Sequence, residues 1–309
     1  MILKLPSLTW RLILFLFVIN TISCWNEDTQ TKSPSEIPTI HSKLALENSD
    51  LSFVLGSTDL SVGQNRLVFG LMDREKGPLR EGLVKVSTYR ITREHSEGPI
   101  EELMATYHPW PAGVGGVYTI EPSFNNPGTW KLDVSVVSVD GSRSLSHSRI
   151  EVASKSATPS IGASVPRSTN KTIYDVDNLK ELTSDRNPDK ELYQMSIAEA
   201  LDTGKPLLIT FSSPAFCLSS VCGPQLSIIK EMKSAHLNLV NFIHIEVYEQ
   251  PHKIQGDLAK ATVSPILIEW GLPSEPWTFI IDGGGILRAK FESYATREEL
   301  EKVLEIIQP

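Results

Sequence analysis

The stretch from Lys205 to Pro224, KPLLITFSSPAFCLSSVCGP, constrains the fold more than any other part of the chain. The apolar run LLITF is typical of a buried strand and ends in Ser-Ser-Pro, and the apolar residues after the loop recur at helical spacing. Cys217 and Cys222, two of the three cysteines in the chain, fall between these segments. This order predicts a strand, a loop that carries a cysteine, and then a helix.

The position of the two cysteines predicts a division of roles. A thiol at a helix start lies near unpaired backbone N–H groups and the positive end of the helix dipole, which favour the thiolate. We therefore predict that Cys217 is the nucleophile and that Cys222, within the first helical turns, resolves a mixed disulfide. Residues five apart in a continuous helix are separated by about 140° around the axis and roughly 7.5 Å along it, farther than a relaxed disulfide reaches. If the cysteines pair, either Cys217 lies in the loop before the helix or the first turn unwinds, which Gly223 and Pro224 would assist.

Residues 1–23 have the pattern of an export signal. Lys4 and Arg11 give a positive start, and the apolar core LILFLFVI is too short to span a membrane comfortably. The sequence TISC resembles a bacterial lipobox, in which signal cleavage leaves the cysteine as a lipid-modified N-terminus. The resemblance implies that Cys24 is lipidated and anchors the chain at the extracytoplasmic face of the cell membrane. The alternative is a plain signal peptide, or an uncleaved anchor, with an incidental cysteine.

The sequence of residues 24–152 predicts a tether followed by an all-β domain. Residues 24–43 are polar and rich in Pro, Ser and Thr, as in a flexible tether. Residues 44–152 consist of short alternating segments separated by turns, and resemble the immunoglobulin-like sandwich modules of bacterial envelope proteins. The loop PWPAGVGG is either a binding loop that presents Trp110 or a connection that packs this side chain on the sandwich. Residues 153–174 are rich in Ser, Thr, Pro and Ala and are predicted to be a linker.

Residues 175–309 alternate strands with helices. The segment 237–250 is predicted to be a buried strand, 270–293 a glycine-linked hairpin and 296–307 a closing amphipathic helix. This order, with cysteines after the first central strand and a proline before the next-to-last strand, resembles a thioredoxin-like domain. Three segments from about residue 190 onward carry the resemblance: ITFSSPAFCLSSVCGP, EPWTFIIDGGGILRAKFE and REELEKVLEII.

The resemblance implies both a fold class and a substrate site. The fold class is α+β with two domains, an all-β immunoglobulin-like sandwich followed by an α/β thioredoxin-like domain. Pro276 matches the family's cis-proline, which lies beside the cysteines and leaves a backbone edge for an extended substrate, so Pro276 and Trp277 are predicted to bind substrate. A net charge of −8 without a Lys/Arg cluster argues against a nucleic-acid partner, because phosphate binding needs a basic surface.

The function implied by the resemblance is thiol–disulfide exchange in the cell envelope. Cys217 would attack and Cys222 resolve, on extracytoplasmic thiol or disulfide proteins, with no cofactor and no metal. The family uses C-x-x-C, whereas this chain has C-x4-C, and three alternatives stay open. The domain could be a docking module with a structural disulfide. It could be a thiol peroxidase, because some peroxiredoxins carry C-x4-C. It could handle copper, with His244 joining the cysteines, although a lone histidine in an apolar strand is typical of a core residue.

Overall fold

The computed structural model describes residues 51–111, 115–217, 221–236 and 238–307. The described residues belong to one compact unit. The predicted export signal, the lipid-modified Cys24 and the tether lie outside the described residues and stay predictions. Within the described ranges, we find no helix with the length and apolar character that a membrane crossing requires.

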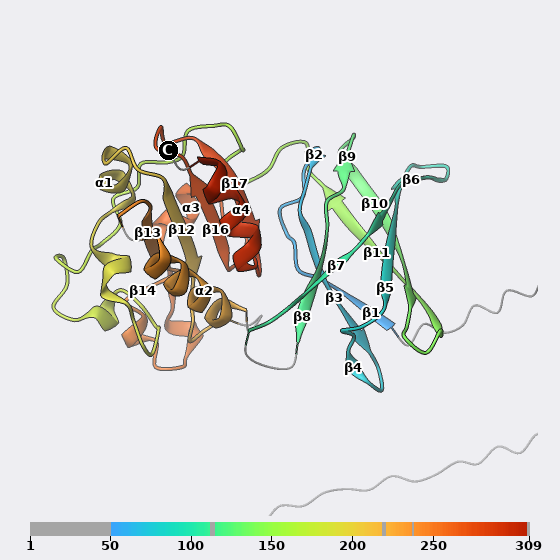
Figure 1. Cartoon of the computed structure of the whole chain (residues 1–309), viewed down its shortest axis with the longest axis horizontal. Helices are drawn as coiled ribbons and strands as arrows, with labels where there is room; N and C mark the ends of the chain where they lie inside the picture. The colour runs from blue at the N-terminus through green and yellow to red at the C-terminus, as the bar shows by residue number, and fades with distance from the viewer. Residues whose placement is uncertain (1–50, 112–114, 218–220, 237, 308–309) are drawn as a thin grey trace, which may run out of the picture. The chain divides into compact units, whose positions relative to one another are not determined.

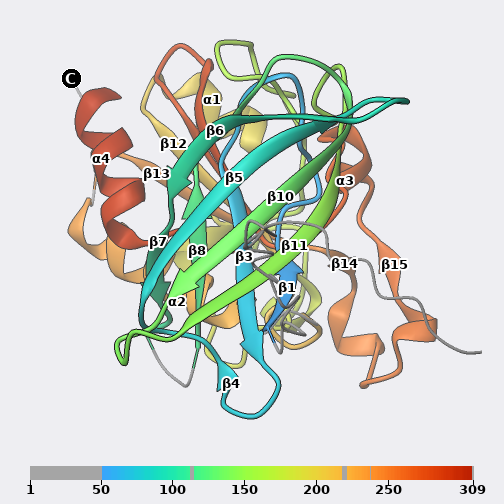
Figure 2. The same ribbon diagram turned by 90° about the vertical axis from the view of Figure 1, so that its right-hand side faces the viewer.

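Residues 51–152 form two antiparallel sheets that share one hydrophobic core (Figure 1). One sheet has the strand order β1-β3-β8-β7, and the other has the order β11-β10-β5-β6, whose strands lie side by side in Figure 2. The strands of the first sheet are β1 (Leu51–Leu55), β3 (Leu67–Asp73), β7 (Thr106–Pro109) and β8 (Gly116–Ile120), with β4 (Gly77–Pro78) paired to β3. Those of the second are β5 (Leu83–Ile91), β6 (Ser96–Met104), β10 (Gly128–Val137) and β11 (Arg143–Val152), and β2 (Gly63–Gln64) pairs with β9 (Ser123–Phe124).

The alternation of buried and partly exposed residues along strand β10 explains how this core forms. In GTWKLDVSVV the residues Trp130, Leu132, Val134 and Val136 are buried, and the residues between them are partly exposed. Because successive side chains of a strand point to opposite faces, this pattern turns one face of the sheet toward the other sheet. Phe69 of the opposite sheet belongs to the same buried cluster.

The mixed α/β part of the chain is built on a four-stranded sheet with the order β13-β12-β16-β17. Strands β12 and β13 are parallel, and the other pairs are antiparallel. All six residues of β12 are buried, as expected for a central strand. The strands are β12 (Leu207–Ser212), β13 (Asn241–Glu246), β16 (Trp277–Ile281) and β17 (Leu287–Glu292), and β14 (Tyr248–Glu249) pairs with β15 (Thr262–Val263) outside this sheet.

Helices cover both faces of this sheet (Figure 1). Helices α2 (Cys222–Ala235) and α4 (Arg297–Ile307) contribute to one buried cluster, together with Leu208 and Ile280 of the sheet. Helices α1 (Ile197–Asp202) and α3 (Pro265–Glu269) contribute to the cluster on the other face, together with Leu207 and Ile281. Short 3-10 helices lie at η1 (Leu179–Glu181), η2 (Lys190–Tyr193), η3 (Pro251–Lys253) and η4 (Leu258–Lys260).

The segment 153–174, which the sequence predicts as a linker, makes ordered contacts with the mixed part. The backbone N–H of Gly162 donates to the carbonyl of Leu287, and the N–H of Leu287 donates to the carbonyl of Ala163. Val165 is buried in the cluster formed with α1 and α3. This segment is therefore held along β17 by backbone hydrogen bonds and by one apolar side chain.

Polar contacts join the two-sheet part to the end of β17 and to α4. The guanidinium of Arg66 pairs with the carboxylate of Glu299 at 2.8 Å and donates to the carbonyl of Tyr294, also at 2.8 Å. The carboxylate of Glu292 accepts hydrogen bonds from the backbone N–H of Thr58, at 2.9 Å and 2.8 Å. Because both carboxylates are largely shielded from solvent, these are contacts of a packed interface.

Candidate redox site

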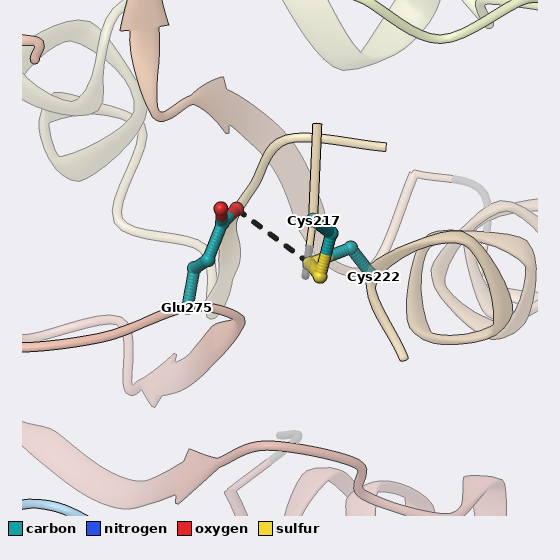
Figure 3. A group of neighbouring side chains, drawn as sticks. All are labelled: Cys217, Cys222 and Glu275. Atoms are coloured by element: carbon teal, nitrogen blue, oxygen red, sulfur yellow. Dashed lines mark hydrogen bonds between the residues drawn. A yellow bond between two sulfur atoms is a disulfide. The ribbon is translucent and has the colours of Figure 1, made fainter. Parts of the chain in front are cut away.

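Cys217 and Cys222 form a disulfide, with their Cα atoms 6.0 Å apart (Figure 3). Helix α2 begins at Cys222. The chain turns directly after β12, because the backbone N–H groups of Phe216 and Cys217 both donate to the carbonyl of Ser213. Of the two arrangements that the spacing allows, the structure has the first, in which Cys217 lies in the loop before the helix.

The position at which α2 begins changes which of the two cysteines the helix terminus stabilises. The sequence predicts Cys217 at the helix start, whereas the N-terminus of α2 lies at Cys222. The N–H groups and dipole that favour a thiolate therefore act on Cys222. Solvent exposure favours Cys217 instead, because Cys222 is fully buried and Cys217 is partly exposed. An attacking thiol from solvent therefore reaches Cys217, and the sulfur released by that attack, Cys222, is the one at the helix start.

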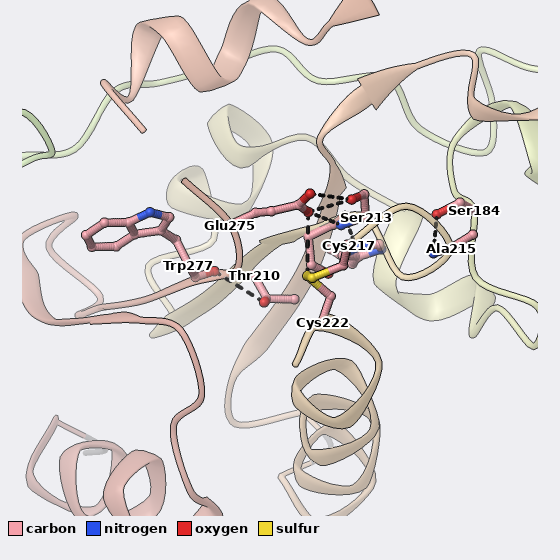
Figure 4. The surroundings of a disulfide bond; sticks show 10 residues. Ser184, Thr210, Ser213, Ala215, Cys217, Cys222, Glu275 and Trp277 are labelled. Carbon is pink, nitrogen blue, oxygen red and sulfur yellow. Dashed lines mark hydrogen bonds between the residues drawn. A yellow bond between two sulfur atoms is a disulfide. The ribbon is translucent and has the colours of Figure 1, made fainter. Parts of the chain in front are cut away.

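Glu275 lies beside the disulfide, in the loop before β16 (Figure 3). One of its carboxylate oxygens is 3.5 Å from the sulfur of Cys222. The backbone N–H and the hydroxyl of Ser213 donate to this carboxylate, each at 2.6 Å (Figure 4). Burial raises the pKa of Glu275, while the hydrogen bonds from Ser213 oppose that shift. Neither Glu275 nor Ser213 is among the site residues predicted from the sequence.

A second buried carboxyl supports the turn that carries Cys217. The backbone N–H of Ser184 donates to Glu246 at 2.7 Å. The hydroxyl of Ser184 accepts from the N–H of Ala215 at 3.1 Å (Figure 4). Burial raises the pKa of Glu246 to about 8, and the charge of Glu275 adds to this shift. The other carboxyl oxygen of Glu246 is buried without a hydrogen-bond partner among the described residues. Glu246 is therefore mostly neutral at pH 7.

The two residues predicted to bind substrate, Pro276 and Trp277, are both buried. The peptide bond between Glu275 and Pro276 is cis, as the resemblance implies. Trp277 is 2% exposed, stacks on Phe279 and donates its indole N–H to the hydroxyl of Ser274 at 3.1 Å. The indole therefore lies in the core, and substrate binding by Pro276 and Trp277 stays a prediction.

His244, the residue of the copper alternative, is a core residue in the structure. Its Nδ1 lies 2.6 Å from the hydroxyl of Tyr193, and its Nε2 lies 3.0 Å from the hydroxyl of Ser212. Burial lowers the pKa of His244 to about 4, so the ring is neutral. Among the described residues, the side chains that could share a metal ion are Cys217, Cys222 and Glu275, without His244.

Trp110 packs against the apolar cluster of the mixed part that contains α2 and α4. Its indole N–H is buried without a hydrogen-bond partner among the described residues. Tyr294 of the mixed part donates its hydroxyl to the carbonyl of the neighbouring Pro109, at 3.4 Å. Of the two interpretations of this loop, the structure favours packing of Trp110 over its presentation to a ligand.

No family model matches the sequence, and no curated protein matches it. Among solved structures, the chain is similar to a thiol:disulfide interchange protein of the thioredoxin family from Chlorobium tepidum TLS, with 13% identity and a TM-score of 0.34 over 48% of this chain and 98% of that one. It is also similar to the exposed lipoprotein thioredoxin Etrx1 of Streptococcus pneumoniae strain TIGR4, with 19% identity and a TM-score of 0.26 over 34% of this chain and 89% of that one. A third similarity is to the PKD domain of human SorCS2, with 10% identity and a TM-score of 0.19 over 41% of this chain and 96% of that one.

Proposed function

We propose that this chain is a thiol–disulfide oxidoreductase whose mixed part is a thioredoxin-like domain. One observation carries the proposal: a disulfide joins a partly exposed cysteine in the loop after a central strand to a buried cysteine at the start of a helix. A disulfide with one accessible sulfur and one stabilised leaving sulfur is suited to exchange, because attack is fastest where the departing thiolate is stabilised.

The exchange proceeds in two balanced steps. A partner thiolate attacks the sulfur of Cys217, the bond between Cys217 and Cys222 breaks, and Cys222 leaves as a thiolate. A second thiolate of the partner then attacks the partner's own sulfur in the mixed disulfide and releases Cys217. The partner dithiol is oxidised to a disulfide, the cysteine pair is reduced, and the two thiolates take up two protons. The Glu275 carboxyl, 3.5 Å from Cys222, is positioned to hold one of these protons.

The location and the accompanying module form part of the proposal. The apolar segment of residues 1–23 and the sequence TISC support export and lipidation at Cys24, on the extracytoplasmic face of the cell membrane. Two antiparallel sheets around one core support an immunoglobulin-like assignment for residues 51–152. The partners would be extracytoplasmic proteins with thiols or disulfides, since disulfides form and persist in the oxidising environment outside the cytoplasm.

Trapping of a mixed disulfide tests the proposed function. The Cys222→Ser variant lacks the resolving thiol and should accumulate a covalent adduct with a disulfide peptide through Cys217. The Cys217→Ser variant is the matched control and should form little adduct, because Cys222 is buried. Mass spectrometry of the intact protein measures both. Absence of adduct in both variants would favour the docking module, in which the disulfide is structural.

A further inference from the structure

We propose that the reduced form of this protein binds one zinc ion through the two thiolates of Cys217 and Cys222 and the carboxylate of Glu275. One possible ligand atom from each of these residues lies within 4.8 Å of the other two (Figure 3). The site goes beyond the proposed exchange reaction, although it uses the same cysteines.

The spacing of sulfur and oxygen fits a tetrahedral zinc ion. With Zn–S bonds of about 2.3 Å and Zn–O bonds of about 2.0 Å, a tetrahedral angle separates the sulfur from the oxygen by about 3.5 Å. The distance from the Cys222 sulfur to the Glu275 carboxylate is 3.5 Å. The same geometry separates two ligating sulfurs by about 3.8 Å. With Cα atoms 6.0 Å apart, rotation of the Cys217 side chain in its loop can supply this separation once the disulfide is reduced.

The surroundings of Glu275 are those of an oriented metal ligand. Hydrogen bonds from the backbone N–H and the hydroxyl of Ser213 fix the carboxylate, and Ser213 is itself fully buried. Such outer hydrogen bonds hold a ligand in place and are typical of metal sites. Three protein ligands leave the fourth position of a tetrahedron for water or a substrate group. Cys217 and Glu275 are both partly exposed, so an ion from solvent can reach two of the three ligands.

The donor set selects zinc among the common ions. Two thiolates exclude magnesium and calcium, which prefer oxygen ligands, and the carboxylate makes the set harder than the sulfur ligands favoured by copper(I). Zinc accepts sulfur and oxygen together. The structure does not supply an imidazole, because both ring nitrogens of His244 are used by Tyr193 and Ser212.

Zinc binding and the disulfide exclude each other, because the same two sulfurs form either one S–S bond or two Zn–S bonds. A phosphine reductant and water convert the disulfide into two thiols and a phosphine oxide. Zinc then displaces the two thiol protons, and no further electrons are transferred. The bound metal would therefore hold the pair in the reduced state and release it when a chelator removes the ion.

Titration of the full chain with zinc tests the site. The phosphine-reduced protein, freed of reductant and kept without oxygen, competes with a chromophoric chelator for Zn²⁺, and the oxidised protein serves as a reference. We expect one zinc per reduced chain and none per oxidised chain. The Glu275→Gln variant should bind at least tenfold more weakly, whereas Glu249→Gln, a change at an exposed acid of β14, should bind as the wild type does.

A second measurement keeps the test informative if Glu275→Gln folds poorly. Cobalt(II) added to the reduced wild type should give a thiolate charge-transfer band of a tetrahedral site, and bound zinc should slow alkylation of Cys217. Equal zinc binding by reduced and oxidised protein, or an unchanged affinity in a folded Glu275→Gln variant, would overturn the proposal. Mixed-disulfide trapping in the presence of a chelator reports on the exchange reaction separately, so either proposal can fail without the other.

Discussion

Replacing Glu246 with glutamine should remove a large pH dependence of stability. In the folded chain burial raises the pKa of this carboxyl from 4.5 to about 8. A carboxyl with a raised pKa in the folded state binds its proton more tightly there than in the unfolded state. Its contribution is therefore fully present below about pH 4.5 and is lost as the pH rises to about 8.

The magnitude follows from the two pKa values of Glu246. Each pH unit between 4.5 and about 8 corresponds to about 1.4 kcal/mol, so the full loss is roughly 5 kcal/mol if the folded structure stays rigid. Entry of water beside the ionised carboxylate would reduce this figure. We expect wild-type protein to lose at least about 2 kcal/mol more free energy of unfolding between pH 5 and pH 8.5 than Glu246→Gln does.

Urea unfolding at several pH values, followed by tryptophan fluorescence with the disulfide intact, measures this difference. The lowered pKa of His244 acts in the opposite direction below about pH 6.5, but it is common to both proteins and cancels in the comparison. Glu249→Gln, at an exposed position, should follow the wild-type curve. Parallel curves for wild type and Glu246→Gln would show that this carboxyl is not buried in its neutral form.

One labelling experiment and two substitutions test the site and the interface. In reduced protein, Cys217 should react with an alkylating reagent faster than Cys222 near neutral pH, and equal, slow labelling of both would contradict its role as the exposed nucleophile. Glu275→Gln should increase the rate at which small thiols reduce the disulfide at alkaline pH by about tenfold. The reason is that an ionised carboxylate no longer repels the departing thiolate of Cys222, and an unchanged rate would refute this. Arg66→Ala should lower the free energy of unfolding by about 2 kcal/mol in urea titrations, because Glu299 would lose its largely shielded partner. A change below about 0.5 kcal/mol would refute that reasoning.

Strong local patterns made most strands and the closing helix predictable. Strand β12 and helix α4 lie where the apolar run and the helical period predict them. Strand β6 carries no such pattern, because SEGPIEELM is polar and lies at the sheet edge, where neither alternation nor apolar runs are needed. The predicted strand 237–250 is shorter in the structure, since β13 ends at Glu246 and the following residues pair in a separate two-stranded sheet.

The sequence identifies only some residues of the candidate site, because only some of them are neighbours in sequence. The cysteines and Pro276 could be recognised from their segments. Glu275 directly precedes that proline, so its place beside the cysteines could have been inferred from the same resemblance. The links from Ser184 to Glu246 and to the Cys217 turn join residues about 30 to 60 apart, and no local pattern carries such contacts.

The boundary of helix α2 matters more for the chemistry than the spacing of the cysteines. A helix that began at Cys217 would stabilise the exposed sulfur as a thiolate and leave Cys222 a buried, unassisted leaving group. Because α2 begins at Cys222, the helix terminus acts on the sulfur that departs when Cys217 is attacked. The four residues between the cysteines therefore separate an accessible sulfur from a stabilised one, and the neighbouring Glu275 decides how much of that stabilisation remains as the pH rises.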